Sequence, residues 1–184
     1  GSTSIELRKK LSVEAFSLTA YYDSVISDYL CAENNINFPE KKTIHGNLVE
    51  VLRYGENPHQ QSAIYSRNTN LDLCQLSGKR LSYNNYNDIY SALNISKTLP
   101  KNTGTVIVKH ANPCGVSVNQ IKIKSYKEAL ACDPISAFGG IVSCNYKITK
   151  IVAKELNKMF LEVIIGIGFD DEALKILKKK INLR

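Results

Sequence analysis

The stretch Val106–Gly115, VIVKHANPCG, decides how we interpret the fold of this chain. The apolar, β-branched run Thr105–His110 is typical of a strand buried inside a sheet. This strand brings Lys109 and His110 to its carboxyl end. Asn112-Pro113 follows, and we expect this pair to end the extended run and turn the backbone. The stretch therefore predicts a buried strand that ends in a polar segment.

The segments on either side alternate between helical and extended patterns. Asp88–Leu99 precedes the strand, and its apolar residues have helical spacing, with an Asp at the start. After the strand we expect helix 125–132, strand 140–144, helix 149–160, strand 162–167 and helix 170–180. The last four residues, 181–184, would suit the start of another strand. This alternation predicts an α/β protein with a largely parallel or mixed sheet and helices on both faces.

The first part of the chain has a different character. Apolar residues recur at threes and fours from Ile5 to Leu30 without Gly or Pro, which predicts one long amphipathic helix or two abutting ones. Residues 31–46 lose this periodicity and gather Asn, Pro and Lys, so we expect a connector and a domain boundary there. Residues 47–54 and 61–66 have strand character. We therefore divide the chain into segments 1–43 and 44–184.

The composition fits a folded protein of one ordinary domain or two small ones. Of the 184 residues, 43% are hydrophobic and 22% are charged, which excludes a disordered chain. The net charge of +7 arises largely from residues 175–184, which hold five basic residues and no acid. We expect a solvated helix face there, with nucleic-acid binding as the less favoured alternative. No membrane span or signal peptide is apparent, so we expect a cytoplasmic protein without a membrane partner.

The cysteines predict neither disulfides nor a metal site. The sequence contains five, with no C-x-x-C pair, so we expect each to act as a small hydrophobic residue. His110 and Cys114 could be two zinc ligands, but zinc-dependent nucleobase deaminases require H-x-E followed by P-C-x-x-C. Position 112 is Asn, and no second cysteine follows Cys114 at that spacing. We therefore expect no zinc.

Lys109 and His110 carry the strongest chemical signal. Adjacent side chains of a strand point to opposite faces, so these two can serve one site only where the strand ends and twists. At such a position a His could accept a proton near neutral pH, and a partly buried Lys could stabilise developing negative charge. The alternative is a Lys that extends from the strand end into solvent beside a hydrogen-bonded His.

Three further segments have unusual local chemistry, and each has a purely structural alternative. Arg53–Gln60 (RYGENPHQ) could clamp a phosphate through its Arg, or it could only reverse the chain. Gly78–Asp88 (GKRLSYNNYND) could bind a heterocycle through its asparagines or form capped turns. Asp133–Gly140 (DPISAFGG) could bring its backbone close to a ligand, or make a tight connection with Phe138 in the core. Spacing alone leaves these alternatives open.

Five motifs in order, RYGENPHQ, GKRLSYNNYND, VIVKHANPCGV, DPISAFGGIV and LEVII, resemble the bifunctional purine-biosynthesis family AICAR transformylase/IMP cyclohydrolase. The resemblance implies that residues 8–30 close a cyclohydrolase domain. It implies that residues 44–184 form the first half of a transformylase domain, with a zinc-free, cytidine-deaminase-like three-layer α/β/α fold. The implied reaction is formyl transfer from 10-formyltetrahydrofolate to the 5-amino group of the nucleotide AICAR, giving FAICAR and tetrahydrofolate.

The resemblance also implies roles for individual residues. Lys109 and His110 match the family's catalytic pair, in which His110 would act on the amine proton and Lys109 would stabilise or relay charge. Arg53 and Tyr54 match a pair that binds AICAR. The other matches are Gly139 against the nucleotide, Glu162 at the ribose, and Asn112 as an orienting residue.

The chain departs from the family pattern in two respects. Gly166-Ile167-Gly168 stands where bacterial members usually have Ala-Pro, so we expect the loop beside Glu162 to differ in shape. The family's folate contacts lie in a second transformylase half, and its cyclohydrolase site lies upstream of Arg8. We therefore expect a fragment that is inactive alone, with the other half and a homodimeric copy as partners. The alternative is a non-catalytic nucleotide-binding or assembly module.

Overall fold

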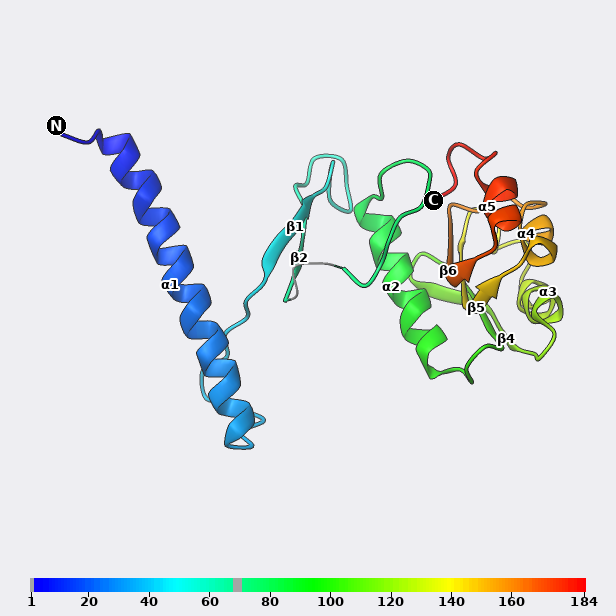
Figure 1. Ribbon diagram of the computed structural model, residues 1–184, viewed down its shortest axis with the longest axis horizontal. Helices are drawn as coiled ribbons and strands as arrows, with labels where there is room; N and C mark the ends of the chain where they lie inside the picture. Colours follow the sequence, from blue (N-terminus) through cyan, green and yellow to red (C-terminus); the bar gives the residue numbers. More distant parts are fainter. Residues whose placement is uncertain (1, 68–70) are drawn as a thin grey trace. The chain divides into compact units, whose positions relative to one another are not determined.

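The computed structural model of the chain describes residues 2–67 and 71–184 (Figure 1). Residue 1 belongs to the expected segment 1–43 and residues 68–70 belong to the expected segment 44–184; both lie outside the described residues. The described helices are α1 Ile5–Glu33, α2 Tyr83–Thr98, α3 Lys122–Cys132, α4 Lys150–Leu156 and α5 Asp171–Leu177. The described strands are β1 Asn47–Val51, β2 Ala63–Ser66, β3 Gly104–Lys109, β4 Asn112–Val118, β5 Ile141–Ile148 and β6 Val163–Phe169. A search of the described helices finds none that is both long and apolar enough to cross a membrane.

The chain divides into two compact units. The first comprises residues 1–51 and 63–72, and the second comprises residues 52–62 and 73–184. This division follows contacts within the fold. The expected boundary between residues 43 and 44 concerns the two domains of the family, and it stays a prediction.

In the first unit, α1 is a single continuous helix. Of the two predictions, one long helix or two abutting ones, the first is observed. Ser4 caps its start, because the Ser4 Oγ accepts a hydrogen bond from the Leu7 N–H at 3.2 Å. Ser24 is the one residue of α1 that is buried in the described structure, and its hydroxyl donates to Thr43 Oγ1 at 2.9 Å. Large apolar side chains of the helix are exposed, among them Leu11, Phe16, Leu18 and Tyr22.

The second unit is built on a four-stranded sheet with the strand order β4-β3-β5-β6. Strand β3 is antiparallel to both β4 and β5, whereas β5 is parallel to β6. Helix α2 covers one face of the sheet, and α3, α4 and α5 cover the other (Figure 1). The prediction of an α/β protein with a mixed sheet and helices on both faces is confirmed.

Strand β3 contributes to the core on both faces, because successive side chains of a strand point to opposite sides. Val106 and Val108 pack toward α2, where Ile89 is also buried. Ile107 points the other way and belongs to the same buried cluster as Tyr126 of α3. These contacts fix the position of β3, and therefore the place at which its carboxyl end delivers Lys109.

The prediction that Asn112-Pro113 ends the extended run is wrong. The turn lies earlier, at His110 and Ala111, and Asn112 already begins strand β4, which pairs antiparallel with β3. Pro113 is tolerated because β4 is an edge strand, where a missing backbone N–H can face away from the sheet.

Helix α2 begins at Tyr83 and not at the predicted Asp88. The start is set by a capping box, in which the Ser82 Oγ accepts from the Asn85 N–H at 3.3 Å and the Asn85 Oδ1 accepts from the Ser82 N–H at 3.1 Å. Of the two alternatives for the asparagines of Gly78–Asp88, the capped turn is thus observed for Asn85.

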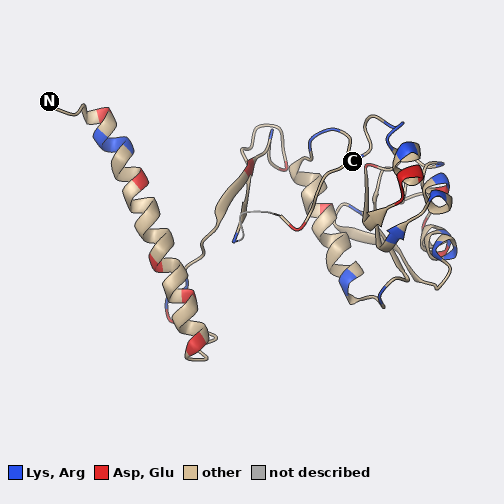
Figure 2. Cartoon of the chain, in the orientation of Figure 1, with Lys and Arg blue, Asp and Glu red and all other residues tan. Residues whose placement is uncertain are grey.

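The basic residues near the end of the chain are partly engaged within the fold. The Lys180 ammonium donates to the Asn157 carbonyl at 2.6 Å and to the Met159 carbonyl at 2.7 Å. The Arg184 Nη1 lies 3.7 Å from Glu162 Oε2, beside β6. Figure 2 shows further basic residues on α3 and α4, with acidic residues among them. Lys175, Lys178 and Lys179 are exposed, so only part of the positive charge of the last ten residues is engaged within the fold.

Candidate active site

The β3–β4 hairpin turns at His110 and Ala111, directly after Lys109. Both turn residues have a positive φ, 53° for His110 and 59° for Ala111, as do the central residues of a type I′ hairpin turn. Lys109 and Asn112 face each other as the last pair of the ladder. Because neither central residue is glycine, the positive φ values cost conformational energy that other contacts must offset.

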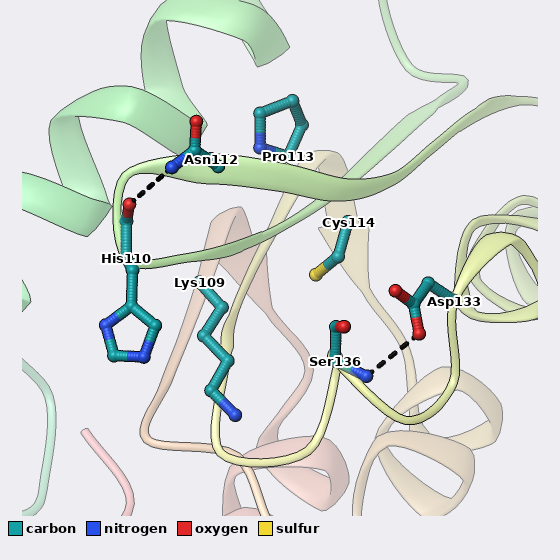
Figure 3. A pocket seen from close by; sticks show the side chains of 7 residues that line it. All are labelled: Lys109, His110, Asn112, Pro113, Cys114, Asp133 and Ser136. Carbon is teal, nitrogen blue, oxygen red and sulfur yellow. Dashed lines mark hydrogen bonds between the residues drawn. The ribbon is translucent and has the colours of Figure 1, made fainter.

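Two side chains hold this turn in place. Asp88 on α2 accepts a hydrogen bond at its Oδ1 from the Ala111 N–H, at 2.7 Å. The Asn112 Nδ2 donates to the His110 carbonyl at 2.9 Å (Figure 3). Asn112 thus acts on the backbone of His110, which is consistent with an orienting residue. The sequence predicts Asp88 as the start of a helix and as the end of the polar stretch Gly78–Asp88, and neither pattern indicates its contact with the turn.

Lys109 and His110 line the same pocket, which has a volume of about 450 Å³. The turn interrupts the alternation of side chains at the strand end, and in Figure 3 both side chains extend from the same side of the hairpin. Lys109 and His110 therefore lie where the strand ends, which is the condition under which adjacent side chains can serve one site. The full lining is Lys109, His110, Asn112, Pro113, Cys114, Asp133 and Ser136.

The loop between α3 and β5, residues 133–140, forms the opposite side of the pocket. The Lys109 ammonium donates to the Phe138 carbonyl at 2.9 Å. Phe138 directly precedes Gly139 in the sequence. Gly139 has a φ of 74°, which glycine adopts without steric cost. Hydrogen bonds from the side chain and backbone N–H of Ser136 lower the pKa of the Asp133 carboxyl. The pocket therefore contains an anionic group as well as the Lys109 cation.

Cys114 contributes a protonated thiol to the pocket. Its Sγ donates to the Ile107 carbonyl at 3.5 Å, and burial raises the pKa of the thiol. A thiol of this kind is a poor nucleophile and a poor metal ligand near neutral pH. Within residues 2–67 and 71–184, no group of three His, Cys, Asp or Glu side chains could hold a metal ion. The expectation that the protein binds no zinc stays a prediction.

Glu162 lies just before β6, and the buried side chain of Asn85 holds its carboxylate. The Asn85 Nδ2 donates to Glu162 Oε2 at 2.8 Å, while the Asn85 Oδ1 accepts from both the N–H and the Oγ–H of Ser82 at 3.1 Å. The two contacts with Ser82 fix which end of the amide faces Glu162. The Arg184 Nη1 lies 3.7 Å from the same Glu162 oxygen. The spacing of Ser82 and Asn85 in the sequence signals the cap, but nothing local signals the contact with Glu162.

Arg53 and Tyr54 lie in the loop 52–62, which folds with the second unit. The Gly55 N–H donates to the Gln60 carbonyl at 2.8 Å, which closes the loop tightly. The Arg53 guanidinium carbon lies 4.8 Å from the centroid of the Tyr54 ring, in a cation–π contact. Neither residue lines the pocket of Lys109 and His110. The structure thus brings Lys109, His110 and Asn112 together in one pocket. Arg53 and Tyr54 lie outside the lining of that pocket.

The pocket combines groups that suit a proton-coupled group transfer. An imidazole can move a proton, an ammonium can stabilise a developing oxyanion, and the turn and loop hold both at one strand end. The fold and the pocket together define an α/β protein with a candidate active site of this class.

Comparison with known proteins gives the family. The sequence profile of the AICARFT/IMPCHase bienzyme family matches residues 1–184, and the chain belongs to this family. The bifunctional purine biosynthesis protein PurH of Persephonella marina is 46% identical over 193 residues. The proteins of that name from Caulobacter vibrioides and Thermoanaerobacter sp. are 42% and 44% identical. Each comparison covers 100% of this chain but only 36–37% of the relative's length.

Proposed function

We propose that the protein to which this chain belongs transfers a formyl group from 10-formyltetrahydrofolate to the 5-amino group of AICAR, in purine (IMP) biosynthesis. The chain supplies the Lys-His part and the AICAR-binding part of the site. One observation carries the proposal: in a chain of this family, Lys109 and His110 line one pocket at the end of β3. The relatives' name, bifunctional purine biosynthesis protein, is consistent with that reaction.

The reaction needs help because the attacking amine is a weak nucleophile, with its lone pair delocalised into the ring. The amine nitrogen forms a bond to the formyl carbon, and the resulting tetrahedral intermediate carries negative charge on oxygen. His110 removes the amine proton, and the ammonium of Lys109 stabilises the oxyanion. The bond between the formyl carbon and N10 of the folate then breaks, and N10 takes up a proton. The amine thus loses one hydrogen and tetrahydrofolate gains one.

The substrate nucleotide is bound by residues from three segments. Arg53 and Tyr54 bind AICAR, Gly139 lies against the nucleotide, and Glu162 contacts its ribose. The hydrogen bond from Asn85 supports the role of Glu162, because it holds the carboxylate in one orientation. The contact between the Lys109 ammonium and the Phe138 carbonyl supports a position for the nucleotide close to the catalytic pair.

The remaining parts of the proposal concern the whole protein. The sheet with helices on both faces supports a cytidine-deaminase-like, three-layer fold of the transformylase part. The folate contacts come from a second transformylase half, the whole protein is also an IMP cyclohydrolase, and it works as a cytoplasmic homodimer. It uses no zinc and has no nucleic-acid or membrane partner.

The role of Lys109 can be tested in the full-length protein. We expect Lys109→Ala to lower kcat for FAICAR formation by about 100-fold, because the oxyanion loses its cation. Lys101→Ala, at an exposed lysine in the turn before β3, is the matched control and should keep the wild-type rate. A kcat near the wild-type value for Lys109→Ala would remove the proposed role.

The alternative function is a non-catalytic nucleotide-binding or assembly module. The position of Arg53 and Tyr54 outside the pocket lining favours it, because a binding pair need not lie beside catalytic groups. Isothermal titration of AICAR into the 184-residue chain, and separately into its Arg53→Ala variant, measures the binding. If AICAR binds through Arg53 while the full-length protein forms no FAICAR, the module is the correct function.

A further inference from the structure

We propose that Asp88 is a positioning residue, which holds His110 at the pocket by fixing the N–H of Ala111. The inference rests on the proposed function, since it concerns the group that removes the amine proton. Asp88 does not line the pocket. It acts through the backbone of the turn, and its effect on the reaction is therefore indirect.

The turn requires such a contact because its conformation is unfavourable. His110 and Ala111 both have a positive φ, and both carry a Cβ, so they lack the freedom of the glycines that usually occupy this type of turn. The ladder of the hairpin ends at the pair of Lys109 and Asn112. The N–H of Ala111 is therefore outside the ladder, and the Asp88 carboxylate accepts it at 2.7 Å. A hydrogen bond to an ionised carboxylate is stronger than one between neutral groups.

The carboxylate is held on a rigid support. Asp88 lies on α2 between Asn85, which is 4% exposed, and Ile89, which is 2% exposed. Ile89 packs in the cluster that contains Val106 and Val108 of β3. Helix α2 and strand β3 thus pack in one buried cluster, and Asp88 fixes the turn relative to the strand that ends in Lys109.

The position of His110 depends on this contact more than that of Lys109 does. Lys109 belongs to the ladder of β3 and also donates to the Phe138 carbonyl. His110 is the first residue of the turn, and its side chain is exposed, so its direction follows the backbone of the turn. A displacement of about 1 Å at a catalytic group can lower a rate by about 100-fold. Loss of the Asp88 acceptor should therefore reduce the chemical step and leave Lys109 in place.

The test compares substitutions at Asp88 in the full-length protein. Asp88→Ala removes the acceptor, Asp88→Leu removes it while preserving side-chain bulk and helix propensity, and Asp88→Asn keeps an oxygen that can accept the Ala111 N–H. We expect kcat to fall about 10- to 100-fold in the Ala and Leu variants, with the dissociation constant of AICAR within about threefold of wild type. Asp88→Asn should restore kcat to within about threefold. Asn87→Ala, at the exposed neighbouring position, is the control and should retain the wild-type kcat.

Amide hydrogen exchange provides a readout that does not depend on activity. In the wild type and in Asp88→Asn, the Ala111 amide should be protected. In Asp88→Ala and Asp88→Leu it should exchange at least about tenfold faster, while the amides of β3 stay protected. Unchanged Ala111 exchange, unchanged kcat in the Ala and Leu variants, or an Asn variant as impaired as Ala would each overturn the proposal. If the wild type forms no FAICAR, the proposed function fails, and the exchange data still decide whether Asp88 holds the turn.

Discussion

At the β3–β4 turn, two side chains from different elements hold the backbone that carries Lys109 and His110. Asp88 accepts the Ala111 N–H from α2, and Asn112 holds the carbonyl of His110 from β4. Asn85, in the first turn of α2, likewise holds a candidate site residue in place, since it donates a hydrogen bond to the Glu162 carboxylate. Substitutions in α2 should therefore alter the site without removing any group that contacts the substrate.

The contact between Asn85 and Glu162 leads to a specific prediction. Asn85→Asp would keep the oxygen that accepts from Ser82 and would place a second carboxylate oxygen 2.8 Å from Glu162 Oε2. Because the two like charges repel, we expect Glu162 to move or to become protonated, and AICAR to bind about tenfold more weakly. Isothermal titration of the full-length protein measures this effect. Asn87→Asp adds the same charge at an exposed position and is the control; equal affinities for all three proteins would contradict the role of Glu162.

The candidate catalytic residues could be recognised from the sequence, while the residues that hold them could not. A β-branched run followed by Lys109 and His110 predicts reactive groups at a strand end, because the pattern is local. The partner of Asn85 is Glu162, and the partner of Asp88 is the backbone of Ala111. Such pairs form only when α2 packs on the sheet, and no pattern of neighbouring residues encodes them.

Among the secondary-structure elements, β4 depends on close contact with α3. A Cβ added to Gly115 would lie 1.9 Å from the Ala129 carbonyl oxygen, so the strand and the helix would have to separate. We expect Gly115→Ala to lower the free energy of unfolding of the second unit by about 2 kcal/mol or more. Urea unfolding followed by circular dichroism measures the loss.

Gly168→Ala is the matched control for this substitution. A Cβ at Gly168 would meet only the Lys147 Cγ at 3.6 Å, which is an ordinary contact with a flexible side chain. We expect a change of less than about 1 kcal/mol. If both variants unfold at the same urea concentration as the wild type, β4 and α3 do not pack as described.

Helix α1 is tied to its neighbours in the first unit by Asp28, and this tie predicts a dependence on pH. A hydrogen bond from Lys42 at 3.0 Å, with further attraction from Arg67 and His45, lowers the pKa of the Asp28 carboxyl. A lowered pKa in the folded state means that the stabilisation is present above the ordinary aspartate pKa of about 4. It is lost as the pH falls through the lowered pKa.

The pH dependence can be measured by NMR, from the backbone signals of residues 43–47 during acid titration. In the wild type, the association of these residues with α1 should weaken below about pH 4. In Asp28→Asn it should already be weaker at higher pH and should change little on acidification. Asp23→Asn, on the same helix, should behave like the wild type. An unchanged acid titration in Asp28→Asn would show that this ion pair does not hold the helix.

The order of helices and strands could largely be predicted, and two of the differences have clear physical causes. The sequence does not predict strand β4, because Pro113 and Gly115 usually interrupt a strand, yet an edge position accepts the proline and a close helix requires the glycine. The sequence predicts the start of α2 at Asp88, because an acidic residue is typical of a first turn. The actual cap at Ser82 depends on the reciprocal bond with Asn85.

On the scale of the whole molecule, the sheet, the pocket and the family membership support one account. The chain belongs to the AICARFT/IMPCHase bienzyme family and spans 36–37% of the length of the relatives compared with it. The proposed reaction therefore belongs to the full-length protein, and this chain contributes the Lys-His pocket of the second unit. The basic residues near the end of the chain are in part engaged within the fold, through Lys180 and Arg184.

The most direct test of this account is the single-turnover rate of FAICAR formation by the full-length protein carrying His110→Ala, at saturating AICAR and 10-formyltetrahydrofolate. Single turnover isolates the chemical step, in which we propose that His110 removes the amine proton. We predict a rate at least about 100-fold below wild type, with AICAR still bound. A single-turnover rate equal to the wild-type rate would contradict the central claim that the pocket at the end of β3 is the site of formyl transfer.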